Sequence, residues 1–483
     1  MRRLIFISVS CLIFLSLLLT GNTSSETPGR RAINGPVVSV ATAATDLAGI
    51  KTDRRIYLKP PLPRLPQAGG KFVDPVFGTE IMRATDESDG AAPGLGTYYS
   101  HWPTFNADNT RLLIRQGDSG NAILKSFDPI SFRIGLGREQ LPTEYPYNFS
   151  LSWESAIWSH NNPDVIYTFC NDFKGGMRLY AYNVISKTFT LLKEFSSLSH
   201  GQPDFLHQMN MSANDDVFSW SHMRTGRNGV PVAYLVWRRS INKILFDVPN
   251  TMDFNEVHVD KTGHWLNIPL NKSLSDGDSM EFLNLDTGAL IKILDGAPDY
   301  RPGHGDLGTD CIVGFDNDLD GITWRRMSAP HSPRHVFYFR TAIGREDGVS
   351  DWTKDFHGTM LADNEDWITI GTFRDPTINL TDSGIYEDEI LQVSLDGSQR
   401  IRRICHTRCA IDFKTNTTGY WAMPKPTISR DGRFIAFTSN WEKSGRYDLF
   451  ISRIDPAPHV TVPSTVSPAI QRQRRVRPSM TFR

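Results

Sequence analysis

One short pattern recurs seven times along this chain, at intervals of about 50 residues with a longer step before the last copy. Each copy opens with a polar or imidazole residue and continues with an alternating apolar strand, a tight turn of Ser, Asn, Asp or Gly, and a second apolar strand. Two clear copies are His207-Gln-Met-Asn-Met-Ser-Ala-Asn-Asp-Asp-Val217 and Lys425-Pro-Thr-Ile-Ser-Arg-Asp-Gly-Arg-Phe434. Because another strand pair follows most of these hairpins, the repeat predicts four strands in each unit.

A segment before the first unit can supply the strand that the last unit lacks. The last unit has no room for a fourth strand before the C-terminal tail, and the segment Asp74–Thr85 has the pattern of that missing outer strand. Seven four-stranded antiparallel units closed by an N-terminal strand predict an all-β fold, a seven-bladed β-propeller over residues 71–455. Two packed β-sandwiches are the alternative, but they require neither a fixed period nor a complementing strand. Closure also explains how one domain exceeds the usual size of ~150 residues.

The chain ends predict export. Arg2 and Arg3 precede an apolar run and then a stretch of small polar residues, which indicates a signal peptide over residues 1–25. An uncleaved N-terminal anchor is the alternative, because ~17 apolar residues are at the short limit for a spanning helix. Residues 26–70, rich in Pro and Gly, are predicted to be a linker, and residues 456–483 a disordered basic tail. We therefore expect a secreted or periplasmic monomer with no other membrane contact.

The charge distribution limits the kinds of partner that the chain can bind, and the cysteine content limits its possible disulfides. Of 52 Lys and Arg, two fall in the first 25 residues and five in the last 28, which leaves 45 bases against all 53 acids in the body. An acidic body predicts no nucleic-acid partner. Cys405 and Cys409 could close a local disulfide loop in an exported protein, whereas Cys170 and Cys311 are predicted to be buried and apolar in role.

The first residues of the innermost strands are the candidate binding site, because in a propeller these strands line the central channel. The alignment of the units places there His101, Glu154, His207, Glu256, His304 and His357, with His258 as an alternative in the fourth unit. Imidazole and carboxylate groups suit Mn, Fe, Zn or Ni, and the same groups serve as general bases. The competing interpretation is that they are simply polar residues at a wet channel mouth.

A second candidate cation site lies in the fifth unit. Asp316, Asp318 and Asp320 alternate before Gly321, a pattern that can wrap Ca²⁺. The residue at the twelfth position of an EF-hand loop would be Met327, which does not ligate, so the loop is either a different calcium site or a solvated hairpin turn. Aromatic residues near the predicted mouth, such as Trp102 and Trp421, could stack on sugars, although packing between blades is the more ordinary role.

Two segments resemble a known family. Asp74–Thr85 and Pro426–Asn440 are similar to the first and last blade segments of oligogalacturonate lyase and, more broadly, of TolB-type propellers. In those lyases a metal ion, typically Mn²⁺, lies at the channel mouth on His and Gln side chains, and the resemblance places His304 and His357 at two of those positions. Tyr420–Pro426 stands where the family has a His-x-His, so further ligands would have to come from residues such as His101 or His207.

Three functional hypotheses follow. The first is a propeller that binds a polysaccharide fragment, a peptide or a partner protein at the channel mouth, because the chain contains no Gly-x-Ser-x-Gly, Walker or His-Glu-x-x-His motif. The second, implied by the resemblance, is a metal-assisted polysaccharide lyase, and the third is a TolB-like envelope scaffold.

Overall fold

The computed structural model describes residues 50–454, with gaps at 118–119, 143–144, 147–150, 152–154, 171–175, 200–202, 225–230, 250–253, 255, 274–276, 295–298, 300, 317–320, 340–353 and 375–384. The predicted signal peptide, the first part of the predicted linker and the basic tail lie outside these residues. No helix in the described part of the chain is long and apolar enough to cross a bilayer.

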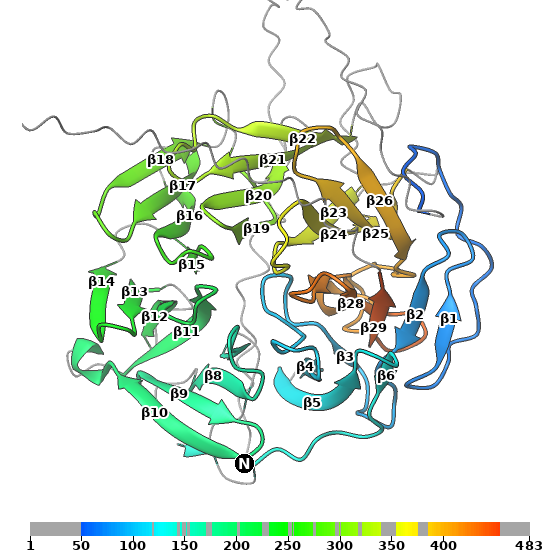
Figure 1. Ribbon diagram of the computed structural model, residues 1–483, viewed down its shortest axis with the longest axis horizontal. Coiled ribbons are helices and arrows are strands. Elements are labelled where there is room, and N and C mark those ends of the chain that lie inside the picture. The colour runs from blue at the N-terminus through cyan, green and yellow to red at the C-terminus, as the bar shows by residue number, and fades with distance from the viewer. Residues whose placement is uncertain are drawn as a thin grey trace, which may run out of the picture.

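Seven antiparallel sheets stand around a central axis (Figure 1), which confirms the all-β seven-bladed propeller. Blades 1 to 6 each contain four strands that follow one another in the chain. Blade 1 is β3 (Leu95–Gly96), β4 (Arg111–Gln116), β5 (Asn121–Asp128) and β6 (Arg133–Ile134); blade 2 is β7 (Ala156–Trp158), β8 (Val165–Phe169), β9 (Arg178–Asn183) and β10 (Thr188–Glu194); blade 3 is β11 (Asp204–Met211), β12 (Val217–Arg224), β13 (Ala233–Arg238) and β14 (Lys243–Pro249). Blade 4 is β15 (His258–Val259), β16 (Trp265–Ser273), β17 (Gly277–Asn284) and β18 (Leu290–Leu294); blade 5 is β19 (Gly305–Gly308), β20 (Cys311–Asp316), β21 (Gly321–Arg326) and β22 (Arg334–Tyr338); blade 6 is β23 (Lys354–Thr359), β24 (Trp367–Arg374), β25 (Glu389–Ser394) and β26 (Ile401–His406).

Blade 7 closes the ring with strands from both ends of the domain. Its inner three strands are β27 (Thr427–Ile428), β28 (Phe434–Ser439) and β29 (Asp448–Arg453), and β2 (Glu80–Arg83) pairs with β29 as the predicted fourth strand. A further strand, β1 (Lys71–Val73), adds a fifth at the edge. In Figure 1 the blue β1 and β2 lie beside the red β29, so the two ends of the domain share one sheet.

Apolar side chains fill the spaces between neighbouring blades. Trp158 of blade 2 and Trp220 of blade 3 belong to one buried cluster that also includes Phe195. Trp102 and Trp441 are buried as well, at 2% and 4% exposure. This packing supports the structural role of most of these aromatic residues. The four described cysteines are buried, and Cys405 and Cys409 are free thiols, so the possible Cys405–Cys409 disulfide is not formed.

Residues 50–70, within the predicted linker, lie against blades 6 and 7. Lys59 forms an ion pair of 2.6 Å with the buried carboxylate of Asp388, and the indole of Trp441 donates to the carbonyl of Pro63 at 3.0 Å. The segment therefore contributes to packing outside the strands of the ring.

The inner edge of blade 1 is interrupted by a loop, residues 97–104, which reaches into the centre of the ring. The loop starts beside blade 7, where Thr97 donates its backbone N–H to Thr438 at 3.0 Å. It also reaches blade 3, where the Trp102 indole donates to the carbonyl of Met209 at 2.9 Å. The loop returns to the sheet at Phe105, which bridges to Leu112.

Charged side chains connect the hairpin turns that follow the innermost strands of different blades. Arg430 of blade 7 donates to Asp363 of blade 6 at 2.9 Å and to the carbonyl of His160 in blade 2. Lys261 of blade 4 pairs with Glu365 of blade 6 at 2.8 Å. The contacts of Arg430 with His160 and of Lys261 with Glu365 join blades that are not neighbours in the ring, so they bridge the channel at this end.

Candidate metal centre in the central channel

Blade 4 presents two ligating side chains to the channel through simple strand alternation. Val257 and Val259 are buried in the core at 0% and 3% exposure, while Glu256 and His258 are half-buried. Because side chains of an extended chain alternate between two faces, Glu256 and His258 share the face opposite the two valines. Their side chains meet: His258 Nε2 lies 3.3 Å from Glu256 Oε2.

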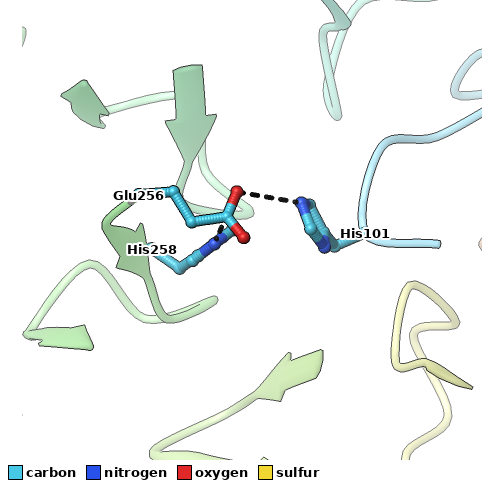
Figure 2. A group of neighbouring side chains, drawn as sticks. All are labelled: His101, Glu256 and His258. Carbon is cyan, nitrogen blue, oxygen red and sulfur yellow. Dashed lines mark ion pairs between the residues drawn. The ribbon is translucent and has the colours of Figure 1, made fainter. Parts of the chain in front are cut away.

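The loop of blade 1 brings a third ligand to this pair. His101 Nε2 lies 3.9 Å from Glu256 Oε2, and the His101 and His258 rings are 4.5 Å apart between centroids (Figure 2). One ligand atom from each of the three residues falls within 4.8 Å of the others, and the described residues contain no other such group of His, Cys, Asp and Glu. The His101 Nε2 atom is buried and has no hydrogen-bond partner among the described residues. The donor set and this unsatisfied nitrogen both fit a divalent transition-metal ion.

The electrostatics of the group keep one acid ionised and one imidazole neutral. Burial and, to a smaller extent, His258 lower the pKa of His101 to about 3, while Glu256 opposes the shift. Burial would raise the pKa of Glu256, but His258, His101 and His207 together lower it to about 2. Burial also acts to lower the pKa of His258, yet the adjacent Glu256 carboxylate outweighs it and raises that pKa above its ordinary value. At neutral pH the cluster therefore contains a carboxylate and a free imidazole at His101.

Two polar side chains from the flanking blades complete the surroundings of His258. Asn210, on β11 of blade 3, places its Nδ2 atom 3.4 Å from His258 Nδ1. Asp306, on β19 of blade 5, accepts the backbone N–H groups of Met360 at 2.7 Å and Leu307 at 2.8 Å. Burial raises the pKa of Asp306 to about 6 despite these two bonds.

A second pair of imidazoles lies on the side of blades 5 and 6. The rings of His304 and His357 stack with centroids 4.9 Å apart, and the Tyr99 ring of the blade 1 loop meets His357 edge-on at 5.0 Å. His357 is 2% exposed, and neither of its ring nitrogens has a hydrogen-bond partner among the described residues. Burial lowers the pKa of His357 far below its ordinary value, and His304 and Lys425 add to this effect.

The predicted site residues therefore separate into groups. His101 and Glu256 meet His258, the alternative considered for blade 4, while His304 and His357 meet each other. Not all of them open an innermost strand: His207 lies within β11, beside an irregularity between His207 and Asn210, and His101 lies in a loop. Glu154 lies outside the described residues.

The predicted calcium loop is described only in part. Asp318 and Asp320 lie outside the described residues, while Asp316 is 1% exposed and its Oδ2 atom is 4.0 Å from Arg325 Nη2. The calcium site remains a prediction.

Sequence reasoning missed Asn210 and Asp306 as members of the channel lining. Asp306 follows His304 by two residues, so strand alternation around β19 was a usable signal for it. Asn210 follows His207 by three residues and reaches the channel because of the irregularity in β11, which the sequence does not reveal. Tyr99 is one of the aromatic residues expected near the mouth, and its contact with His357 depends on the path of the loop.

Comparison with known proteins supports the fold. No family model matches the chain, and no curated protein matches it in sequence. Among solved structures, an oligogalacturonate lyase from Vibrio parahaemolyticus and an oligogalacturonate lyase in complex with manganese both align with a TM-score of 0.55 and 11% identity. The alignments cover 81% and 82% of this chain and 98% of each lyase. The resemblance inferred from the two sequence segments is thus confirmed for the fold.

Proposed function

We propose that this propeller binds a divalent transition-metal ion in its central channel, at His101, Glu256 and His258, and uses the site to hold a ligand. The observation that carries the proposal is the convergence of these three side chains from two blades that are not neighbours. Nitrogen and carboxylate donors favour Mn, Fe, Zn or Ni over Ca²⁺, which prefers oxygen ligands alone.

A ligand with a carboxylate suits the chemistry of this channel. A bound divalent ion supplies positive charge and Lewis acidity to an anionic group. The imidazoles of His304 and His357 lie nearby, and the buried ammonium of Lys425, 3.7 Å above the Tyr420 ring, adds positive charge close to His357. A polysaccharide fragment with acidic sugars or an acidic peptide would meet donors on one side and aromatic faces on the other.

Metal analysis of the purified protein tests this proposal. We expect about one equivalent of Mn, Fe, Zn or Ni after loading and removal of excess metal, and a loss of at least tenfold in affinity for His101→Ala and for Glu256→Gln. His264→Ala is the matched control, because this exposed histidine pairs with Asp286 at a blade turn away from the cluster. Absence of bound metal in the loaded wild-type protein, or equal loss in the His264 variant, would overturn the proposal.

A lyase-like activity is the second candidate, favoured by the fold shared with an oligogalacturonate lyase that is in complex with manganese. Such a reaction removes the proton beside the sugar carboxylate and breaks the bond to the leaving oxygen, which leaves a carbon–carbon double bond. Incubation of the metal-loaded protein with oligogalacturonate tests it through the ultraviolet absorbance of the unsaturated product. If the protein binds metal and oligogalacturonate but forms no such product, the binding function alone remains.

A further inference from the structure

The side chain of Asn210 connects blades 3 and 4 directly beside the cluster. Its Oδ1 atom accepts the backbone N–H of Val259 at 3.0 Å. Because that N–H needs an acceptor, the amide has one orientation, with its oxygen on Val259 and its NH₂ group toward His258. The Nδ2 atom then faces His258 Nδ1 at 3.4 Å, so a donor is directed at this ring nitrogen.

This orientation selects a tautomer of His258. In a neutral imidazole one nitrogen carries the proton and the other accepts. With a donor in front of Nδ1, the favoured form accepts there and carries its proton on Nε2, which faces the Glu256 carboxylate at 3.3 Å. His258 therefore offers Glu256 a proton at the position where a metal would need a lone pair.

Metal-binding histidines usually have the opposite arrangement. Their second nitrogen donates its proton to a carboxylate, a backbone carbonyl or water, and this contact fixes the ring and raises its basicity. A metal on His258 Nε2 would move the proton to Nδ1, where it would face the Asn210 NH₂ group. We propose that Asn210 is a positioning residue that holds His258 in its Nε2–H tautomer. This tautomer lowers the affinity of the site formed by His101, Glu256 and His258 for its metal ion, so the ion stays exchangeable.

This inference rests on the proposed metal function, and Asn210→Asp tests it. One carboxylate oxygen of the variant can keep the bond from Val259, while the other accepts a proton from His258 Nδ1. We expect the Kd for Co²⁺ to fall by about 10- to 100-fold, which is the usual effect of an outer carboxylate on a metal-bound histidine. An unchanged or larger Kd would overturn the role of Asn210.

A double-mutant cycle separates this effect from the added negative charge. His258→Gln removes the ring, so Asn210→Asp in that background retains the charge but not the tautomer effect. We expect the gain in Co²⁺ affinity to drop below about threefold in the His258→Gln background. If the gain is equal in both backgrounds, charge alone is responsible and the positioning role is wrong.

Nitrogen NMR of the metal-free protein provides a readout that does not depend on metal binding. At a pH where His258 is neutral, we expect its proton on Nε2 in the wild type and on Nδ1 in Asn210→Asp. A wild-type proton on Nδ1 would overturn the inference even if the variant does not fold. If the tautomers are as expected but no form of the protein binds metal, the proposed function fails and the assignment of the tautomer to Asn210 stands.

Discussion

The indole of Trp102 donates to the main-chain carbonyl of Met209 at 2.9 Å, a bond between blade 1 and blade 3 that reaches across 107 residues of sequence. Trp102 directly follows His101, and its ring packs at 4.2 Å from the His101 imidazole. This bond therefore holds the loop that delivers the third member of the cluster.

Trp102→Phe should lower metal affinity as well as stability. The variant leaves the Met209 carbonyl without its donor, which costs about 1–3 kcal/mol of unfolding free energy. We also expect about a tenfold rise in the metal Kd, because His101 is no longer held in place. Trp441→Phe is the matched control, since it loses an indole bond to Pro63 of 3.0 Å on the outer side of blade 7. Equal metal affinity in the two variants would contradict the role of the loop.

Metal binding should displace one proton, from His258, at a pH below the raised pKa of this residue. His101, with its pKa lowered to about 3, and Glu256, with its pKa lowered to about 2, have already lost their protons at neutral pH. His258 has its pKa raised, so it is the group that must release a proton as the metal binds. A plot of log Kd against pH, measured by calorimetry, should have a slope near −1 below the His258 pKa and flatten above it. A slope near −2 would show that His101 is protonated as well.

The fold could be predicted from the sequence because a propeller repeats its local pattern in every blade. The Ser429–Phe434 turn and its counterparts mark each hairpin, and the pattern of Asp74–Thr85 identified the strand that closes blade 7. The site could be predicted only in part. Repetition places side chains at equivalent positions, but the His101 loop breaks the repeat, and its path depends on long-range contacts such as Trp102 with Met209.

Closure of the ring should depend on a buried carboxylate in blade 7, that of Asp448, which pairs with Arg83 and Arg446. Arg83 of β2 donates to Asp448 of β29 at 2.6 Å, and both side chains are at most 5% exposed. Asp448 also accepts from Arg446 at 2.7 Å, so Asp448→Ala leaves two guanidinium groups without this carboxylate, which we expect to lower the unfolding free energy by about 3–5 kcal/mol. Asp396→Ala removes the exposed pair with Arg400 and should cost less than about 1 kcal/mol. Urea unfolding measures both, and similar losses would show that the buried pair does not hold the ring closed.

Asp306 should make the metal-free protein less stable as the pH rises from about 4 to 6. Burial raises its pKa from 3.8 to about 6, so the folded state holds the proton more tightly than the unfolded chain does. The unfolded chain releases its proton first, and stability falls through this window by up to about 3 kcal/mol and then levels off.

Asp306→Asn should remove this fall, because an amide does not ionise. The variant has one acceptor oxygen where Asp306 uses two, for Met360 and Leu307, so it should be less stable than the wild type at pH 4 by about 1 kcal/mol. At pH 7.5 the order should reverse. Urea unfolding in the presence of a chelator, repeated at several pH values from 4 to 7.5, shows whether the stability curves of the wild type and the variant cross.

Asp396→Asn is the control for this comparison. Burial opposes ionisation of Asp396, but hydrogen bonds from Ser398 and Arg400 hold its pKa below the ordinary value. The group is ionised in both states above pH 5, so its replacement should shift stability by a constant amount from there to pH 7.5. Parallel curves for the wild type and Asp306→Asn would mean that Asp306 is solvated in the channel and ionises normally.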